Sequence, residues 1–319
     1  MLKWFTIPAG DKITVEEGLN GALAEYYPLS YLHMCADERE WTGKPSTTQL
    51  IAGTRLEYLR LLTPYAINPD AKSFQIVGTR AHEKLEKCTP DESIAEFHLA
   101  DNEISGIPDL LEKQPDDDRW MLTDYKVWGS YRVMLALGLE KKKRLAFDRN
   151  GVPILYSKSG KWGKAGSQKQ ENYFESNPDL VDIPETELQL NRYRIIIEKT
   201  FNIKISEMRI FIIVRDGNTV IAKGRGISKN TYYVRIRELD YDMIHSYFEK
   251  KRKALLTALN AYQKESGITD FKHLQENPDM KLIKAHCPSP CDDIESWNGR
   301  RCDGYCVVSE ICEEITKNA

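Results

Sequence analysis

Four short polar motifs constrain the fold of this chain more than any other feature. Each interrupts an apolar stretch, and together their side chains suit a single metal ion. In chain order the motifs are Gly78-x-x-x-His82, Gly106-Ile107-Pro108-Asp109, Asp124-Tyr125-Lys126 and Gln189-x-x-x-Tyr193. A set of cysteines near the end of the sequence accompanies them. The fold therefore has to gather segments as far apart as residues 82 and 193.

A chain of 319 residues, 41% hydrophobic and 29% charged, can bury a full core as one large domain or two small ones. Its net charge of −3 argues against a general electrostatic attraction to DNA, so any nucleic-acid contact needs locally concentrated positive charge. Two basic runs supply it: Lys141-Lys142-Lys143-Arg144, and Lys158, Lys161, Lys164 and Lys169 with Trp162 among them. Each run taken alone is equally consistent with a solvated loop.

The sequence also indicates a cellular compartment. No apolar run approaches the ~18–20 residues of a membrane span, and Met1–Pro8 is too short and mixed for a signal peptide. We therefore expect a cytoplasmic protein without membrane association. Its seven cysteines would stay reduced there, so a cluster of them indicates metal binding rather than disulfides.

The hydrophobic periodicity predicts an α/β fold, in the sense of an α+β arrangement with a mixed sheet. The strands are expected over residues 94–99, 103–111, 119–128, 208–214, 219–224 and 232–237, with Asp101-Asn102 as a turn. The helices are expected over residues 20–35, 48–62, 73–87, 129–139, 184–201 and 241–262. Residues 140–187 are polar and loop-rich, with one hairpin predicted about Asp148-Arg149-Asn150-Gly151.

Asp109, Asp124 and Lys126 form a candidate catalytic group. Asp109 ends one predicted strand and Asp124 lies in the next, so adjacent strands can bring both carboxylates to one edge of a sheet. Lys126 follows Asp124 by two residues and shares its strand face. Carboxylate oxygens suit Mg²⁺ or Mn²⁺, and an ammonium group beside them can orient a water molecule or offset phosphate charge. Any one of these motifs alone is more often a surface pair, a turn or a helix histidine.

The succession of all four motifs resembles the RecB-like branch of the PD-(D/E)XK nuclease superfamily. The resemblance implies a restriction-endonuclease-like core that uses Mg²⁺ or Mn²⁺. Under it, His82, Asp109 and Asp124 are metal ligands, joined by the carbonyl of Tyr125. Lys126 is the catalytic lysine, and Gln189 and Tyr193 lie on a helix beside the site.

The resemblance also predicts a domain organisation. Residues 72–265 are the expected nuclease core, with an insertion over residues 129–187 between the third and fourth motifs. Residues 1–71 and 266–319 are expected to form a discontinuous helical iron–sulfur subdomain from both termini. The insertion is longer than relatives usually have, and it holds both basic runs. We interpret it as a flap that guides DNA through Lys158, Lys161, Trp162 and Lys164, or equally as an arm that docks a partner protein.

The cysteines resemble those of the superfamily's iron–sulfur members, which include CRISPR-associated exonucleases and AddB-type helicase–nuclease subunits. One cysteine before the core and three after it would hold a [4Fe–4S] cluster, here Cys35, Cys302, Cys306 and Cys312. The spacer between Cys302 and Cys306 is one residue longer than usual. A zinc site of Cys287, Cys291, Cys302 and Cys306 is the alternative.

The expected activity is hydrolysis of DNA phosphodiester bonds by a metal-dependent exonuclease that acts on single strands or ends. Such an enzyme would serve recombination, repair, phage replication or CRISPR adaptation. A protein partner in a DNA-processing complex and an oligomeric state are both compatible with the sequence. The alternatives are a nuclease-like module that binds DNA or protein without cleavage, and a nuclease directed at RNA.

Overall fold

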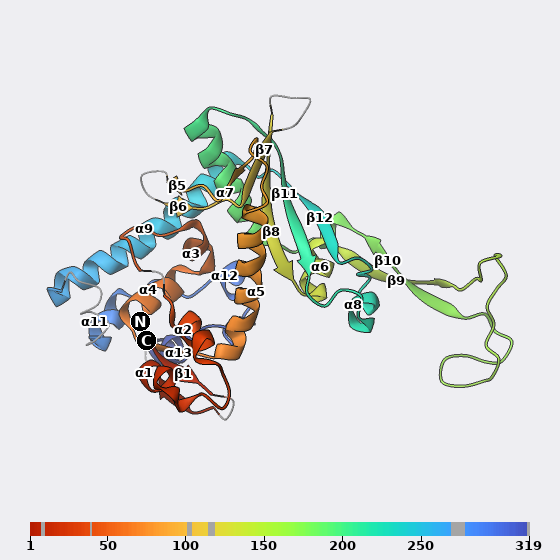
Figure 1. Ribbon diagram of the computed structural model, residues 1–319, viewed down its shortest axis with the longest axis horizontal. Helices are drawn as coiled ribbons and strands as arrows, with labels where there is room; N and C mark the ends of the chain where they lie inside the picture. Colours follow the sequence, from red (N-terminus) through yellow and green to blue (C-terminus); the bar gives the residue numbers. More distant parts are fainter. Residues whose placement is uncertain (8–9, 39, 101–103, 114–118, 269–277, 318–319) are drawn as a thin grey trace. The chain divides into compact units, whose positions relative to one another are not determined.

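The computed structural model describes residues 1–7, 10–38, 40–100, 104–113, 119–268 and 278–317, so Asp101-Asn102 lies outside the described residues (Figure 1). The chain is mixed α/β, as predicted, with both parallel and antiparallel pairing: β1 (Leu2–Thr6) pairs antiparallel with β2 (Lys12–Thr14) and parallel with β3 (Tyr65–Ile67). None of the described helices combines the length and apolar character needed to cross a bilayer.

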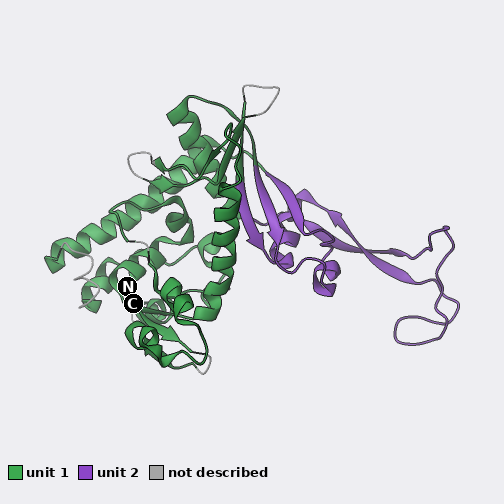
Figure 2. Cartoon of the chain, in the orientation of Figure 1, with its two compact units in different colours: residues 1–123, 184–208, 236–319 green, residues 124–183, 209–235 purple. Residues whose placement is uncertain are grey.

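The chain divides into two compact units (Figure 2). Unit 1 comprises residues 1–123, 184–208 and 236–319, and unit 2 comprises residues 124–183 and 209–235. The division passes within β8 (Trp120–Trp128) and β11 (Ile205–Val214), so both strands belong to both units. The terminal segments and most of residues 72–265 are together in unit 1.

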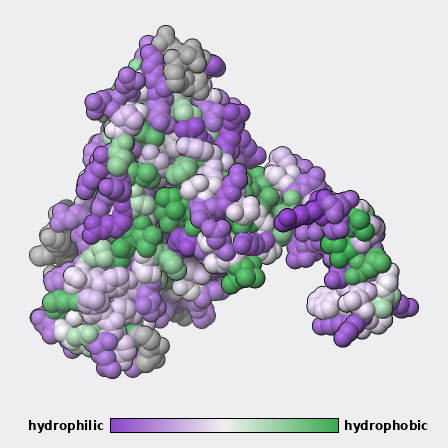
Figure 3. All heavy atoms as spheres, turned by 45° about the vertical axis from the view of Figure 1, so that its right-hand side comes forward, coloured by the Kyte–Doolittle hydropathy of each residue, from purple (hydrophilic) through white to green (hydrophobic). Residues whose placement is uncertain are grey.

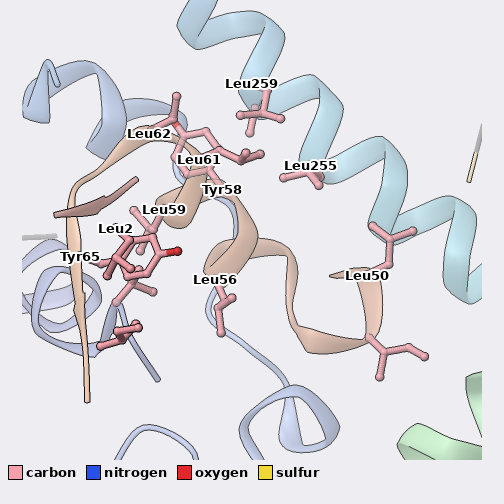
Figure 4. Packing of buried hydrophobic residues seen from close by; sticks show 14 of the residues in the cluster. Leu2, Leu50, Leu56, Tyr58, Leu59, Leu61, Leu62, Tyr65, Leu255 and Leu259 are labelled. Atoms are coloured by element: carbon pink, nitrogen blue, oxygen red, sulfur yellow. The ribbon is translucent and has the colours of Figure 1, made fainter. Parts of the chain in front are cut away.

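The main core of unit 1 forms where α4 (Thr54–Leu62) packs against α9 (Tyr241–Ser266). Figure 4 shows leucines of α4 facing Leu255 and Leu259 of α9. Tyr58, Leu59 and Leu255 are fully buried. Each buried leucine contributes roughly 1.5–3 kcal/mol, so this contact is a principal source of the unit's stability.

Short helices and strands surround this core. The remaining elements of the terminal segments are α1 (Val15–Glu17), a π-helical turn (Gly18–Ala22), α2 (Leu29–Ala36), α3 (Thr47–Ala52), α11 (Met280–His286), α12 (Asp293–Ser296) and α13 (Ser309–Lys317). The predicted helix 48–62 is interrupted at Gly53, whose φ of +128° ends α3 before α4 begins. The predicted helix 20–35 is likewise divided between the π-helical turn and α2.

The principal sheet has five strands in the order β12-β11-β8-β7-β4. β4 (Ile94–Ala95) and β8 both pair antiparallel with β7 (Leu110–Lys113). The register of β7 with β8 places Leu110 opposite Thr123 and Leu111 opposite Leu122. A separate pair, β5 (Leu99–Ala100) with β6 (Ser105–Gly106), lies between β4 and β7 in the sequence.

Two long helices carry sequence motifs in unit 1. α5 (Pro69–Glu86) begins at the N-cap Asn68, and Pro69 occupies its first turn, where a missing N–H costs nothing. α7 (Pro184–Phe201) begins at Pro184, which confirms the predicted bounds 184–201. Eleven of its eighteen residues are buried, including Tyr193, so α7 is an internal helix.

Unit 2 carries a long antiparallel hairpin that the sequence analysis only partly predicted. β9 (Leu139–Leu145) pairs with β10 (Gln170–Ser176) from Leu139↔Ser176 to Leu145↔Gln170. We call residues 146–169, which join the two strands, the arm. The predicted hairpin at Asp148–Gly151 is confirmed within it by the bridge between Phe147 and Pro153. Apolar side chains gather on the surface of the arm (Figure 3).

The other elements of unit 2 correct one prediction. Residues 219–224 are not a strand: Val220–Gly224 form α8, because the Thr219 hydroxyl accepts the Ala222 N–H and caps a helical turn. Val220 and Ile221 are β-branched residues of the kind that favour strands, yet both lie exposed on this short helix. α6 (Ser130–Ala136), the 3₁₀ turn Pro178–Leu180 and β12 (Thr231–Ile236) complete the described elements of this part of the chain.

Candidate metal centre

Three side chains of unit 1 meet in a group that can hold a metal ion. His82 lies near the end of α5, Glu96 directly follows β4, and Asp109 directly precedes β7. Their ligand atoms all lie within 4.8 Å of one another. The His82 Nδ1 is 3.4 Å from Asp109 Oδ1. The structure thus brings together two of the predicted ligands, His82 and Asp109, which are distant in the sequence.

Glu96 is the member that the sequence analysis missed. It has a φ of +41°, unusual for a residue with a side chain, and its N–H donates to the Asp109 carbonyl at 3.2 Å. The pKa of Glu96 is raised by burial and then by the nearby carboxylates of Glu86 and Asp109. In the sequence, Glu96 is a carboxylate within the alternating segment Ile94–Leu99. A carboxylate there is equally consistent with the solvent-facing side of a strand.

The donor set fits a divalent ion of the predicted kind. Two carboxylates and water are ordinary ligands of Mg²⁺ and Mn²⁺, and a single imidazole favours Mn²⁺ because first-row transition ions accept nitrogen more readily. The carboxylates of Glu83, Glu86 and Asp109 all raise the pKa of Glu96, whereas His82 lowers it. The group is therefore a concentration of negative charge that a cation would relieve.

Asp124 and Lys126 are both on β8, as predicted, and belong to unit 2. Asp124 is almost fully buried, and the Lys126 Nζ lies 2.5 Å from its Oδ2. The ring of Tyr125 points to Phe211, with ring centroids 6.3 Å apart. Asp124 directly follows Thr123, the partner of Leu110 in the sheet, and Asp109 directly precedes Leu110.

Gln189 and Tyr193 lie one turn apart on α7, and the Gln189 amide donates to the Tyr193 hydroxyl at 3.4 Å. Tyr193 is buried and lies directly against Gly106: a Cβ at that position would lie 2.4 Å from the tyrosine ring. The second and fourth motifs are therefore in contact through the glycine and the ring. This explains why a glycine stands three residues before Asp109.

The predicted nucleic-acid-binding residues Lys158, Lys161, Trp162 and Lys164 are all exposed on the arm. Trp162 is 79% exposed, and the Lys161 ammonium lies 5.5 Å from its ring centroid. The Lys169 ammonium lies 5.6 Å from the ring of Tyr156 in the same way. An exposed indole beside ammonium groups presents a flat stacking surface with positive charge around it.

The predicted cluster cysteines occupy different surroundings within unit 1. Cys35 is buried on α2, where its thiol hydrogen bonds with Tyr31 and interacts with Lys72. Cys302 is exposed, and Cys306 and Cys312 are partly buried against the core. Among the described residues, the His82 group is the only one with three ligand atoms within 4.8 Å, so no three cysteine sulfurs are this close.

No family model matches this sequence, and no curated protein matches it either. We therefore infer function from the chemistry of the two sets of candidate ligands, namely the His82 group and the cysteines.

Proposed function

We propose that this protein is a metal-dependent nuclease of the PD-(D/E)XK type that hydrolyses DNA phosphodiester bonds, as an exonuclease on single strands or ends. The observation that carries the proposal is the convergence of His82, Glu96 and Asp109 in one group of ligand atoms. Three separate elements, α5, β4 and β7, position these ligand atoms. A helix histidine or a turn aspartate with only a structural role would not need to lie close to two other ligand side chains.

His82, Glu96 and Asp109 would hold Mn²⁺ or Mg²⁺. Asp124 and the Tyr125 carbonyl are proposed as further ligands from the order of the motifs in the sequence. A bound ion supplies electrophilic activation of the phosphate and a lowered pKa for the attacking water. The Lys126 ammonium, held by Asp124 at 2.5 Å, orients this water or offsets the charge that develops on the phosphate. Tyr193 supports the loop before Asp109 through its contact with Gly106.

The arm supports DNA as the substrate. Its exposed lysines contact phosphates, and Trp162 stacks on a base, a combination that tracks single strands without reading their sequence. Positive charge concentrated in one segment also explains how a chain with a net charge of −3 would bind a polyanion such as DNA.

The test compares the full-length protein with Glu96→Gln, Asp109→Asn and Lys126→Ala on end-labelled single-stranded and duplex DNA, with Mn²⁺ or with a chelator. Asp70→Asn is the matched control, because this carboxylate lies at the other end of α5. We expect metal-dependent cleavage by the native chain and the control. Loss of Glu96 or Asp109 should weaken Mn²⁺ binding, measured by calorimetry. The decrease should be at least the ~10–100-fold that follows the loss of a residue hydrogen-bonded to a metal ligand.

Lys126→Ala should bind Mn²⁺ and DNA yet cleave at a rate reduced by about 10²-fold or more. If the native chain and all variants behave alike in Mn²⁺, the nuclease proposal is wrong. DNA binding without cleavage would identify a binding module instead. Faster cleavage of a matched RNA oligonucleotide would make RNA the substrate.

A further inference from the structure

The first turn of α4 is capped by residues from the end of the chain. Its N-cap, Gly53, has no side chain to accept the free N–H groups of the helix. The Leu56 N–H instead hydrogen bonds to the Cys291 thiol, and the Thr54 N–H donates to Glu295 Oε1 at 3.3 Å. A Cβ on Gly53 would lie 3.0 Å from the Cys291 sulfur. The glycine is therefore required for the sulfur to approach the helix end.

Arg55, in the same turn, links two more cysteines to this place. Its Nε donates to the carbonyl of Pro288, the neighbour of Cys287, at 2.8 Å. Its Nη1 lies 3.6 Å from the Cys312 sulfur. The segments that carry Cys287, Cys291 and Cys312 thus all contact residues 53–56.

The charge of Arg55 indicates what these thiols do. Arg55 is only 8% exposed, and among the described residues its hydrogen-bond acceptors are a carbonyl, the Thr316 hydroxyl and a thiol, with no carboxylate. A buried guanidinium needs an anionic partner. Four thiolates around a metal carry a net negative charge, so a thiolate centre beside Arg55 would provide it.

Cys306 completes the set. The Val308 N–H hydrogen bonds to its thiol just before α13 begins. Its thiol interacts electrostatically with those of Cys291, Cys302 and Cys312, and Cys287 interacts with Cys312.

We propose that Cys287, Cys291, Cys306 and Cys312 form one thiolate metal centre, an iron–sulfur cluster or a zinc ion, beside the first turn of α4. The N–H groups of Leu56 and Val308 donate hydrogen bonds of the kind that thiolate ligands commonly accept. The centre fastens residues 287–312 to α4 and leaves out Cys35 and Cys302. It goes beyond the proposed nuclease function and does not depend on it.

Cys35 and Cys302 provide the sharpest contrast. The thiol of Cys35 interacts with Tyr31 and Lys72, and no cysteine is among its described partners. Cys302 is exposed, and the thiol that it is seen to act on is that of Cys306. A zinc ion would draw the four sulfurs to about 3.8 Å from one another, given a Zn–S distance of ~2.3 Å, whereas an iron–sulfur cluster holds them farther apart.

The experiment measures iron, zinc and sulfide per chain, with the visible spectrum, in full-length protein purified without oxygen. Serine variants of Cys287, Cys291, Cys306 and Cys312 are compared with Cys35→Ser, Cys302→Ser and Cys88→Ser. We expect each of the four variants to lose at least about fivefold in bound metal, because a missing thiolate opens the site, while the three comparators keep the native content. Iron with sulfide identifies a cluster, and zinc in a colourless protein identifies the single ion.

A native protein without metal overturns the proposal. So does retained metal in Cys287→Ser or Cys291→Ser while Cys35→Ser or Cys302→Ser loses it. A second measurement needs no variant: alkylation and mass spectrometry of the native chain before and after chelation. The four proposed ligands should become reactive only after chelation, and Cys302 should react throughout. Unchanged reactivity of the four would also overturn the proposal.

Discussion

At the scale of single residues, the candidate site contains groups whose role depends on the residues that they contact. Glu96 has an unusual backbone angle, and its pKa is raised by burial and then by the carboxylates of Glu86 and Asp109. Gly106 is needed because the Tyr193 ring occupies the space that a Cβ would fill. Neither requirement is visible in the immediate sequence of either residue.

The contact between Gly106 and Tyr193 gives a prediction about stability. Gly106→Ala should lower the free energy of unfolding by about 1–3 kcal/mol, because the methyl group overlaps a buried ring that cannot leave easily. Urea unfolding measures it. Gly78→Ala is the matched control: it lies within α5 with nothing within 4 Å, so it should stabilise by about 0.5–1 kcal/mol. Equal stability of the two variants would show that Tyr193 does not press on Gly106.

At the scale of elements, one lysine with two carboxylate partners holds the segment that carries Cys291. The Lys251 ammonium on α9 donates to Glu295 on α12 at 2.6 Å and to Asp292 at 2.7 Å. Glu295 is 2% exposed and also accepts the Thr54 N–H of α4. A single lysine thus connects the long helix, the short helix and the first turn of α4.

Lys251→Met should lower the free energy of unfolding by about 2–4 kcal/mol, somewhat less than the loss of a fully buried pair, because it strands the Glu295 charge while Lys251 is partly exposed. Lys253→Met, an exposed position on the same helix, should change it by less than about 0.5 kcal/mol. Thermal and urea unfolding measure both. If Lys251→Met is as stable as the native chain, Glu295 has other sufficient partners.

At the scale of the whole molecule, the chain combines a unit with a large core and a unit whose most exposed part is the arm. The described arm residues include exposed apolar side chains at Phe147, Val152 and Leu155 in addition to its lysines. Their exposure indicates that the arm contributes little to folding. Its length and charge are then available for binding.

Replacing residues 147–168 by Asn-Gly should preserve the fold, because Ala146 and Lys169 already face each other, with the Ala146 N–H donating to the Lys169 carbonyl at 2.8 Å. The free energy of unfolding should change by less than about 1 kcal/mol. Affinity for single-stranded DNA should fall, and its dependence on salt should weaken by roughly 0.7 per lost phosphate contact.

Trp162→Ala separates stacking from charge in the same measurement. It should cost about 1–3 kcal/mol of DNA binding and leave the salt dependence as it is in the native protein. Unchanged affinity in both variants would remove the arm from the DNA-binding surface and favour its alternative role as a docking arm.

Much of the fold follows from local physical rules. Pro184 and the 3.6-residue period of α7 mark a helix whose bounds are predicted without tertiary information. Local rules fail where an unusual backbone angle or a cap decides the outcome. Gly53 divides a predicted helix because its φ is positive, and Thr219 starts a helical turn in a segment rich in strand-forming residues. The hairpin β9–β10 was missed because its strands are mainly polar and exposed.

The order of the polar motifs in the sequence by itself determined which residues to suspect, namely His82, Asp109, Asp124 and Lys126, since their types limit the chemistry that they can perform. Only the tertiary structure decided that Glu96 joins His82 and Asp109, and that Cys287 and Cys291 lie by α4 while Cys35 lies by Tyr31 and Lys72. The physical reason is that ligand sets form in space. The pairing of strands and the packing of helices choose the neighbours of a side chain, whereas its position in the sequence does not.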